Sequence, residues 1–171
     1  MKTTYTVGYR RKREGRTNYK KRLELLKGRK PRLVIRRTNT QLILQIIEYN
    51  PDGDKIIITT NSNELKNQGW THSFKNMPAA YLAGLLTAKK AKEKNVTEAI
   101  LDLGLQKPHK GSRIYSALHG VIDGGLNVPA NEEIFAEEKR EQGEHIAKYI
   151  EKHKTITQDF QKVAEKLKGK N

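Results

Sequence analysis

The sequence contains no cysteine, which excludes a disulfide framework and any metal site built from thiolates. It also contains no apolar run close to the roughly 20 residues that a membrane-spanning helix needs. Its first residues lack the apolar stretch of a secretory signal, and no segment of the chain repeats another. These absences predict a soluble protein of the cytoplasm that has no membrane partner.

Acidic residues are scarce at the N-terminal end of the chain. Residues 1–37 hold 15 Lys or Arg against only Glu14 and Glu24, a net charge of +13. The other 134 residues hold 19 basic and 17 acidic side chains, so they contribute only +2 to the total of +15. A positive field concentrated in this way attracts polyanions, and it favours nucleic acid or an acidic protein as the partner.

Past the basic segment, three runs rich in β-branched residues are separated by turn signals. Pro51-Asp52-Gly53 divides the second run from the third, because Pro presets φ and Gly accepts positive φ. Further on, Asn76 and Pro78 mark the start of a helix made mostly of small and apolar residues. The predicted elements are strands over 32–39, 41–50 and 55–60, a helix over 78–94, a strand over 99–104, and a helix from Ile114 that stops at Asp123.

The predicted element order, βββαβα, is that of one mixed sheet covered by helices, and ribonuclease-H-like proteins share it. We therefore predict an α/β fold, with a single core in a chain of this length. The division that follows is a basic arm over 1–28 ending in a short helix over 18–27, a core over 29–129, and a helical extension over 130–171. In the extension we predict one helix over 132–152 and a second that aligns Ile156, Phe160, Val163 and Leu167.

Few residues carry a signature of catalysis. Asp102 lies in the predicted fourth strand, and ribonuclease-H-like nucleases use strand carboxylates to hold two metal ions. That chemistry needs several acids at one site, whereas the first strand offers only arginine there. The alternative for Asp102 is a polar residue at a strand end, bonded to the backbone or to a nearby cation. The five His residues show no metal-ligand spacing, so we predict no catalytic residue, metal site or cofactor, and keep a metal-dependent nuclease as the rival hypothesis.

The arm has features beyond its charge. Tyr5, Tyr9 and Tyr19 are interleaved with the cations, and their rings can stack on unpaired bases. In the first strand, the period of two places Arg32 and Arg36 on the same face. Arginine near the end of this strand on both faces cannot be wholly buried, so the predicted binding surface continues from the arm onto the sheet. A solvated tail or address label for the arm, and simple ion pairs for the strand arginines, remain the alternatives.

A short loop offers a second site for an anion. The run KGSR, over 110–113, is similar to a phosphate-binding turn at the start of a helix, because Gly allows close approach and the first helical N–H groups point outward. It lacks the pattern of a nucleotide-hydrolysing loop. A phosphate of a nucleic-acid backbone suits it equally well.

Longer stretches carry a family resemblance. The run YTVGYRRKREGRTNYKKRLELL followed by PRLVIRRTNTQLILQIIEY resembles the start of the universal large-subunit ribosomal protein eighteen in its archaeal and eukaryotic form. Later stretches agree, namely AAYLAGLLTAKKAK, KGSRIYSALHGVIDGGLNVP and GEHIAKYIE. The resemblance covers Tyr5 to about Glu151 in order, without a missing block.

The resemblance implies a protein of the ribosomal large subunit that has a mixed α/β domain of ribonuclease-H-like topology and no catalytic role. Its partners would be 5S ribosomal RNA, which it would help to attach at the central protuberance, 23S ribosomal RNA, and neighbouring ribosomal proteins. The RNA contacts implied by the motifs, extended to the next arginine of the arm, fall into three groups. These are the arm group Arg10, Arg11, Lys12, Arg13, Arg16, Thr17, Asn18, Tyr19 and Arg22, the strand group Arg32, Arg36, Thr38 and Asn39, and the loop group Lys110, Ser112 and Arg113.

Overall fold

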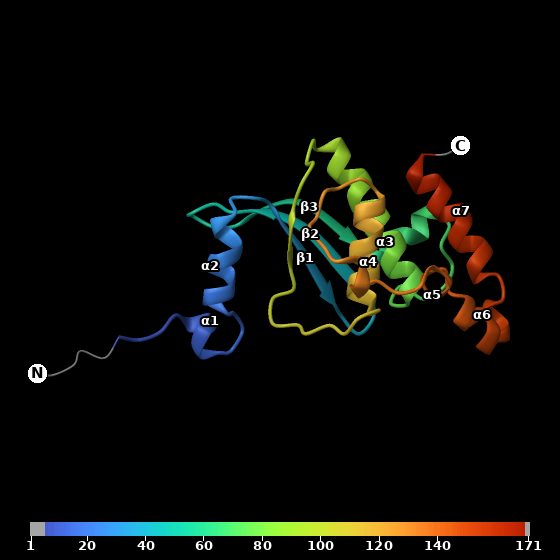
Figure 1. Ribbon diagram of the computed structural model, residues 1–171, viewed down its shortest axis with the longest axis horizontal. Coiled ribbons are helices and arrows are strands. Elements are labelled where there is room, and N and C mark those ends of the chain that lie inside the picture. The colour runs from blue at the N-terminus through green and yellow to red at the C-terminus, as the bar shows by residue number, and fades with distance from the viewer. Residues whose placement is uncertain (1–5, 170–171) are drawn as a thin grey trace, which may run out of the picture.

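The fold is built on one four-stranded mixed sheet, seen in a computed structural model that describes residues 6–169 (Figure 1). Tyr5, which we expected to stack on bases, lies outside the described residues. The strands are β1 (Arg32–Arg37), β2 (Leu42–Glu48), β3 (Lys55–Asn61) and β4 (Ile100–Asp102), in the order β3-β2-β1-β4. The first three pair antiparallel and β4 lies parallel to β1. This arrangement confirms the predicted mixed α/β fold.

The two faces of the sheet differ in what covers them. In β2, Leu42, Leu44 and Ile46 are buried, whereas Ile43, Gln45 and Ile47 on the other face are partly exposed, as the alternation of a strand dictates. Helices α3 (Met77–Glu93) and α4 (Arg113–Asp123) pack on the first face (Figure 1). No long helix among residues 6–169 crosses the second face.

Helices α3 and α4 approach each other closely because glycine lies at the crossing. A Cβ atom on Gly84 of α3 would lie 2.1 Å from the carbonyl oxygen of Ala117, and one on Gly120 of α4 would lie 2.1 Å from that of Tyr81. Neither position therefore has room for a side chain. Asn76 caps α3 by accepting a hydrogen bond from the Ala79 N–H at 2.9 Å, as its position before Pro78 predicts.

The last helix, α7 (Ile156–Lys168), completes the core against α3. The residues predicted to align on it, Ile156, Phe160, Val163 and Leu167, are all buried, which confirms that prediction. Before it, the single helix expected over 132–152 is wrong. Gly143 adopts a φ of 88°, which an α-helix cannot contain, and the segment divides into short turns. These are η2 (Glu132–Ile134), α5 (Glu138–Glu141), α6 (Glu144–Tyr149) and η3 (Glu151–His153).

The remaining elements are short. A 3₁₀ helix, η1 (Ser62–Gln68), follows β3 and was not predicted. At the N-terminal end, α1 (Arg10–Arg13) and α2 (Tyr19–Lys27) lie on the side of the sheet away from α7 (Figure 1). Within residues 6–169 no helix is long and apolar enough to cross a membrane. The boundaries at residues 28 and 129 stay a prediction.

Candidate nucleic-acid interface

The arm is folded by contacts of its own. Asn18 caps α2, its side-chain oxygen accepting a hydrogen bond from the Lys21 N–H at 3.1 Å. The rings of Tyr9 and Tyr19 pack with their centroids 5.0 Å apart, and Arg11 Nε donates to Thr17 Oγ1 at 2.8 Å. No residue of α1 or α2 is buried. The arm therefore takes its shape from caps, ring contacts and ion pairs, because it has no apolar core.

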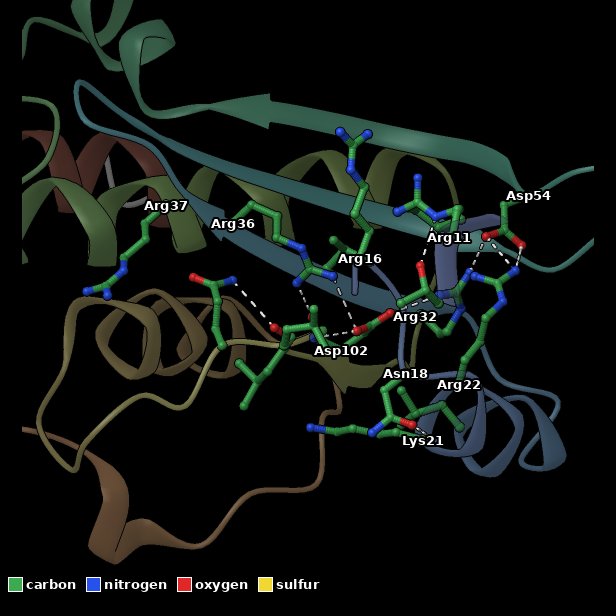
Figure 2. A pocket seen from close by; sticks show the side chains of 18 residues that line it. Arg11, Arg16, Asn18, Lys21, Arg22, Arg32, Arg36, Arg37, Asp54 and Asp102 are labelled. Atoms are coloured by element: carbon green, nitrogen blue, oxygen red, sulfur yellow. Dashed lines mark hydrogen bonds and ion pairs between the residues drawn. The ribbon is translucent and has the colours of Figure 1, made fainter. Parts of the chain in front are cut away.

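A cleft of about 600 Å³ lies between the arm and the open face of the sheet (Figure 2). The arm, including α2, lines one side, the β4–α4 loop lines another, and the outer residues of β1 form the floor of the cleft. Seven of the lining residues are Lys or Arg, and two are acidic. The basic lining residues are Arg11, Arg16, Lys21, Arg22, Arg32, Arg36 and Arg37. This excess of five positive charges suits a polyanion.

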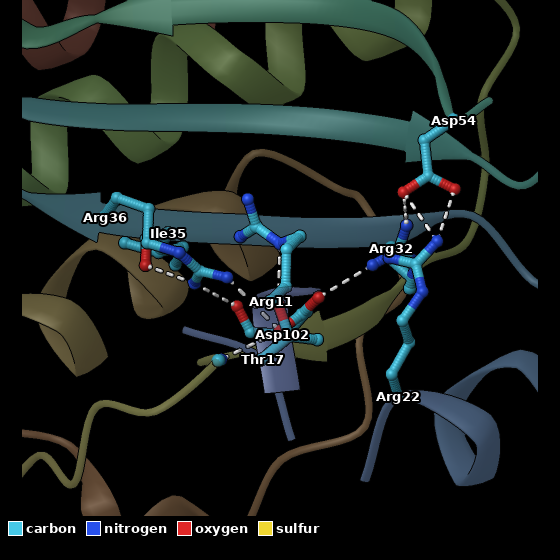
Figure 3. A network of polar contacts seen from close by, with 9 residues as sticks. Arg11, Thr17, Arg22, Arg32, Ile35, Arg36, Asp54 and Asp102 are labelled. Carbon is cyan, nitrogen blue, oxygen red and sulfur yellow. Dashed lines mark hydrogen bonds and ion pairs between the residues drawn. The ribbon is translucent and has the colours of Figure 1, made fainter. Parts of the chain in front are cut away.

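Asp54, just after the β2–β3 turn, ties the arm to the sheet (Figure 3). Both of its carboxylate oxygens accept hydrogen bonds from Nη2 of Arg22 on α2, at 2.8 and 2.9 Å. One of them also accepts from Arg32 Nη2 on β1, at 2.6 Å. A single carboxylate thus fixes two guanidinium groups from different parts of the chain.

Asp102, at the end of β4, extends the same network (Figure 3). Its carboxylate accepts from Arg32 Nη1 at 2.8 Å, from Arg36 Nη2 at 3.3 Å and from the Gly104 N–H at 2.8 Å. Burial raises the pKa of the Asp102 carboxyl, but the hydrogen bond from Gly104 and the charges of Arg36 and Arg32 outweigh burial and lower the pKa overall. We call Arg22, Asp54, Arg32, Asp102 and Arg36 the arginine network.

The arginine network shows which alternative applies to Asp102. Its carboxylate is engaged by two guanidinium groups and a backbone N–H, as expected for a strand-end residue bonded to nearby cations. Among residues 6–169 there is no group of three or more His, Asp or Glu side chains placed to hold a metal ion. Nothing in this geometry favours the nuclease hypothesis.

The structure brings most of the predicted arm and strand residues to the cleft, though not in equal roles. Arg11, Arg16, Thr17, Asn18 and Arg22 line it together with Arg36. Arg32 also lines it, but its side chain is only 4% exposed, and its Nε is buried without a partner. Outside the lining, Arg10, Lys12 and Arg13 are exposed on α1, and Tyr19 packs on Tyr9.

Two predicted groups lie apart from the cleft lining. Thr38 holds the β1–β2 turn through hydrogen bonds with Gln41, and Asn39 is exposed beside it. In the loop group, Lys110 pairs with Glu133 at 3.2 Å, and Arg113 Nη1 donates to the Lys75 carbonyl at 2.8 Å. Ser112 is the N-cap residue of α4, but its hydroxyl is buried without a partner. The turn residues and the loop group therefore lie apart from the cleft lining.

Some residues of the cleft were not predicted from the sequence. Lys21, Arg37 and Gln106 line it, and Asp54 positions two of its arginines. The sequence signal for Lys21 was present, because it follows the capping residue Asn18 within the basic run. No local signal pairs Asp54 with Arg22, since 32 positions separate them.

A second polar cluster lies on the helical side of the molecule, around a pocket of about 280 Å³. His119 Nδ1 lies 2.7 Å from Glu141 Oε2, and Tyr81 donates to Asp123. His119 also stacks on Phe135, with centroids 4.5 Å apart. The hydrogen bond to Glu141 raises the pKa of His119 against the opposing effect of burial, and burial followed by the Asp123 hydrogen bond raises the pKa of Tyr81. We call Tyr81, His119, Asp123 and Glu141 the histidine cluster.

Comparison with known proteins bears on what the cleft binds. A family model described as "Ribosomal large subunit proteins 60S L5, and 50S L18" matches residues 3–98 and 87–131. The chain is 53% identical over 148 residues to the large ribosomal subunit protein uL18 of Korarchaeum cryptofilum, across 86% of this chain and 76% of that protein. It is 46% identical over 164 residues to uL18 of Methanoregula boonei, across 96% and 94% of the two chains.

Proposed function

Because the chain belongs to the family of ribosomal large-subunit proteins that includes 60S L5 and 50S L18, we propose that it binds 5S ribosomal RNA and helps attach it to 23S ribosomal RNA at the central protuberance. Membership itself makes the chain an RNA-binding structural component of the large subunit that serves translation. The identity of the RNA and the place in the subunit are the proposed part. We further propose that the chain contacts neighbouring ribosomal proteins and that it acts in the ribosomes of the cytoplasm.

The observation that carries the proposal is the cleft between the arm and the open sheet face. It combines seven cations with two acids, and three of its arginines, Arg22, Arg32 and Arg36, are held in fixed directions by Asp54 and Asp102. Fixed guanidinium groups recognise phosphates at set positions, so shape and backbone geometry dominate recognition. A folded RNA of defined shape fits this surface better than an acidic peptide, whose charges are not fixed in space.

The predicted contacts divide by exposure. Arg10, Arg11, Lys12, Arg13 and Arg16 are exposed and are proposed to contact phosphates directly. Arg22 and Arg36 are proposed to contact RNA from their network positions. Arg32 is too buried to present its charge, so we propose that it positions Asp54 and Asp102. The turn residues Thr38 and Asn39 and the loop group Lys110, Ser112 and Arg113 are proposed as contacts outside the cleft.

The test is a gel-shift titration of 5S ribosomal RNA at several salt concentrations. Changing Arg10, Arg11 and Arg13 together to Ala should weaken binding and lower the salt dependence, the slope of log K against log salt, by about two for three lost phosphate contacts. A matched control removes three exposed lysines of the helical side, Lys89, Lys92 and Lys94, and should change neither quantity by as much. Unaltered affinity and slope in the arm variant would disprove the proposed role of the arm.

The rival hypothesis has its own experiment. The purified protein is incubated with labelled RNA and magnesium, and intact RNA is expected throughout. Cleavage that disappears in Asp102→Ala would replace the proposed function with a nuclease.

A further inference from the structure

Arg36 is held in one orientation by the protein itself. Its Nη1 donates to the Ile35 carbonyl at 3.0 Å and to the Asp102 carbonyl at 2.7 Å, and its Nη2 donates to Asp102 Oδ1 at 3.3 Å (Figures 2 and 3). Both hydrogens of Nη1 are thereby engaged, and one of Nη2. Three bonds from two nitrogens fix the plane of a guanidinium group, which carries only five N–H donors in all.

One flat face of that plane is covered by Gly104. A Cβ atom built on Gly104 would lie 2.8 Å from Arg36 Nη2, 3.1 Å from Cζ and 3.6 Å from Nε. These three distances place the Cβ position above the face of the guanidinium group, over Nη2. A position in the plane at the same distances from Nη2 and Cζ would lie either closer to Nε or much farther from it. Gly104 has a φ of +58°, so the backbone also favours glycine there. Glycine thus lets the backbone lie flat against the guanidinium.

The exposure of Arg36 indicates that the other face is the one open to the cleft. Arg36 lines the cleft, and its side chain is 37% exposed although Gly104 covers one side. The exposed part is therefore the opposite face and the free edge. Arg11 and Arg16 line the same cleft from the arm, and Leu105, which is 55% exposed, lies next along the chain from Gly104.

We propose that the open face of the Arg36 guanidinium is a stacking platform for one unpaired base of the bound RNA. Arg11 and Arg16 take the phosphates on either side of that nucleotide. The proposal rests on the proposed function and names how one residue of the cleft performs it. A fixed guanidinium plane stacks on a base at little entropic cost, and unpaired bases are commonly bound this way. A cleft of about 600 Å³ lies in the range of sites that enclose small ligands.

The first experiment distinguishes recognition by the flat guanidinium group of Arg36 from recognition by its positive charge alone. Arg36→Lys keeps the positive charge but has no flat group, so binding to 5S ribosomal RNA should weaken about tenfold with an unchanged salt slope. If Arg36 only pairs with a phosphate, Lys preserves the affinity, and the platform is disproved. Thermal unfolding of the variant shows whether it is folded at the binding temperature.

A second variant leaves every charge in place. Gly104→Ala adds a methyl group only 2.8 Å from Arg36 Nη2, so it displaces the plane and should weaken binding in the same direction as Arg36→Lys. Gly69→Ala is the matched control, because Gly69 also has a positive φ, +97°, but has no atom within 4 Å of a Cβ. Equal affinity in Gly104→Ala and Gly69→Ala would overturn the platform even if Arg36→Lys failed to fold.

Chemical probing of the RNA at nucleotide resolution supplies the direct readout. In complex with the unaltered protein, one unpaired base should be protected, and in complex with Arg36→Lys that base alone should become reactive. If the unaltered protein does not bind 5S RNA more tightly than an unrelated RNA of equal length, the proposed function fails. If it binds, but the same bases are protected in both complexes, only the platform fails.

Discussion

The two polar clusters of this molecule both pair carboxylates with hydrogen-bond donors, but they differ in their balance of charge. The arginine network has three cations and two acids and lies under an open sheet face. The histidine cluster has two acids around one His and lies where α7 and the α5 segment meet α3 and α4. The first carries an excess of positive charge, part of it exposed in fixed directions, while the second holds one imidazole between two carboxylates and buries Glu141 Oε1 without a partner. We infer that this difference in the balance of acids to cations is what makes the first cluster suitable for binding an anion and the second suitable for holding helices together.

The two sides also differ in what keeps them folded. On the arm side no residue of α1 or α2 is buried, so the ion pairs of Asp54 contribute much of its attachment to the sheet, and salt weakens such pairs. On the helical side Ile156, Phe160, Val163 and Leu167 are buried with α3 and α4, and burial of apolar surface is insensitive to screening. Variants on the two sides should therefore differ in kind as well as in size.

The largest effect is expected where α3 and α4 touch. Gly84→Ala introduces a Cβ atom 2.1 Å from the Ala117 carbonyl oxygen, so the helices must move apart. We expect the free energy of unfolding to fall by about 3 kcal/mol, measured by urea titration at low and high salt with the same result. Lys89→Ala, at an exposed position of the same helix, should change it by less than about 0.5 kcal/mol. An unfolding free energy unaffected by Gly84→Ala would contradict the close approach.

An intermediate effect is expected from detaching the arm. Asp54→Asn removes the charge that holds Arg22 and leaves buried Arg32 with Asp102 alone, so stability should fall by roughly 1 to 2 kcal/mol. Hydrogen exchange should quicken over α2 and not over α3, and high salt should produce the same local pattern in the unaltered protein. Asp52→Asn, two residues away on an exposed turn, is the control. Equal exchange in α2 for both variants would mean that Asp54 does not hold the arm.

The smallest effect is a pH dependence on the helical side. The pKa of His119 is raised above 6.5 in the folded protein, first by its hydrogen bond to Glu141, and also by the charges of Glu141, Asp123 and Glu138. The protonated form therefore stabilises the fold, fully below pH 6.5, and this contribution is lost as pH rises through the raised pKa. As pH rises from 6.5 through the raised pKa of His119, stability should decline more in the unaltered protein than in His119→Gln. His109→Gln, in an exposed loop, should decline like the unaltered protein, and parallel curves for all three would refute the role of His119.

Local patterns in the sequence predicted the elements that depend on local forces. The β-branched runs formed β1, β2 and β3, Asn76 and Pro78 began α3, and the period of Ile156 and Phe160 produced the buried face of α7. The expected helix over 132–152 failed because its helix-forming residues outweighed Gly143 in the pattern, whereas in the fold Gly143 packs against Pro78 and Ile156. A contact of that kind is set by tertiary structure and has no local signature.

For the candidate site, too, local features were predicted from the sequence and long-range contacts were not. The basic residues of the arm and their continuation to Arg36 were readable from charge and from the period of a strand. The burial of Arg32 was not, because it depends on Asp54 and Asp102, which lie 22 and 70 positions away in sequence. The platform face of Arg36 depends on Gly104, which reads in the sequence only as the end of a strand. Charge was thus predictable, and the direction in which each charge points was not.

The arginine network also constrains how this chain can change over generations. Arg22, Asp54, Arg32 and Asp102 come from four segments, yet a neutral residue at Asp54 would leave a buried guanidinium only partly compensated. A neutral residue at Arg32 would in turn leave Asp54 with Arg22 alone and Asp102 with Arg36 as its only cation, in a cleft that must attract an anion. Substitutions at these four positions are therefore expected to become fixed together or not at all, so the four residues should evolve as one unit.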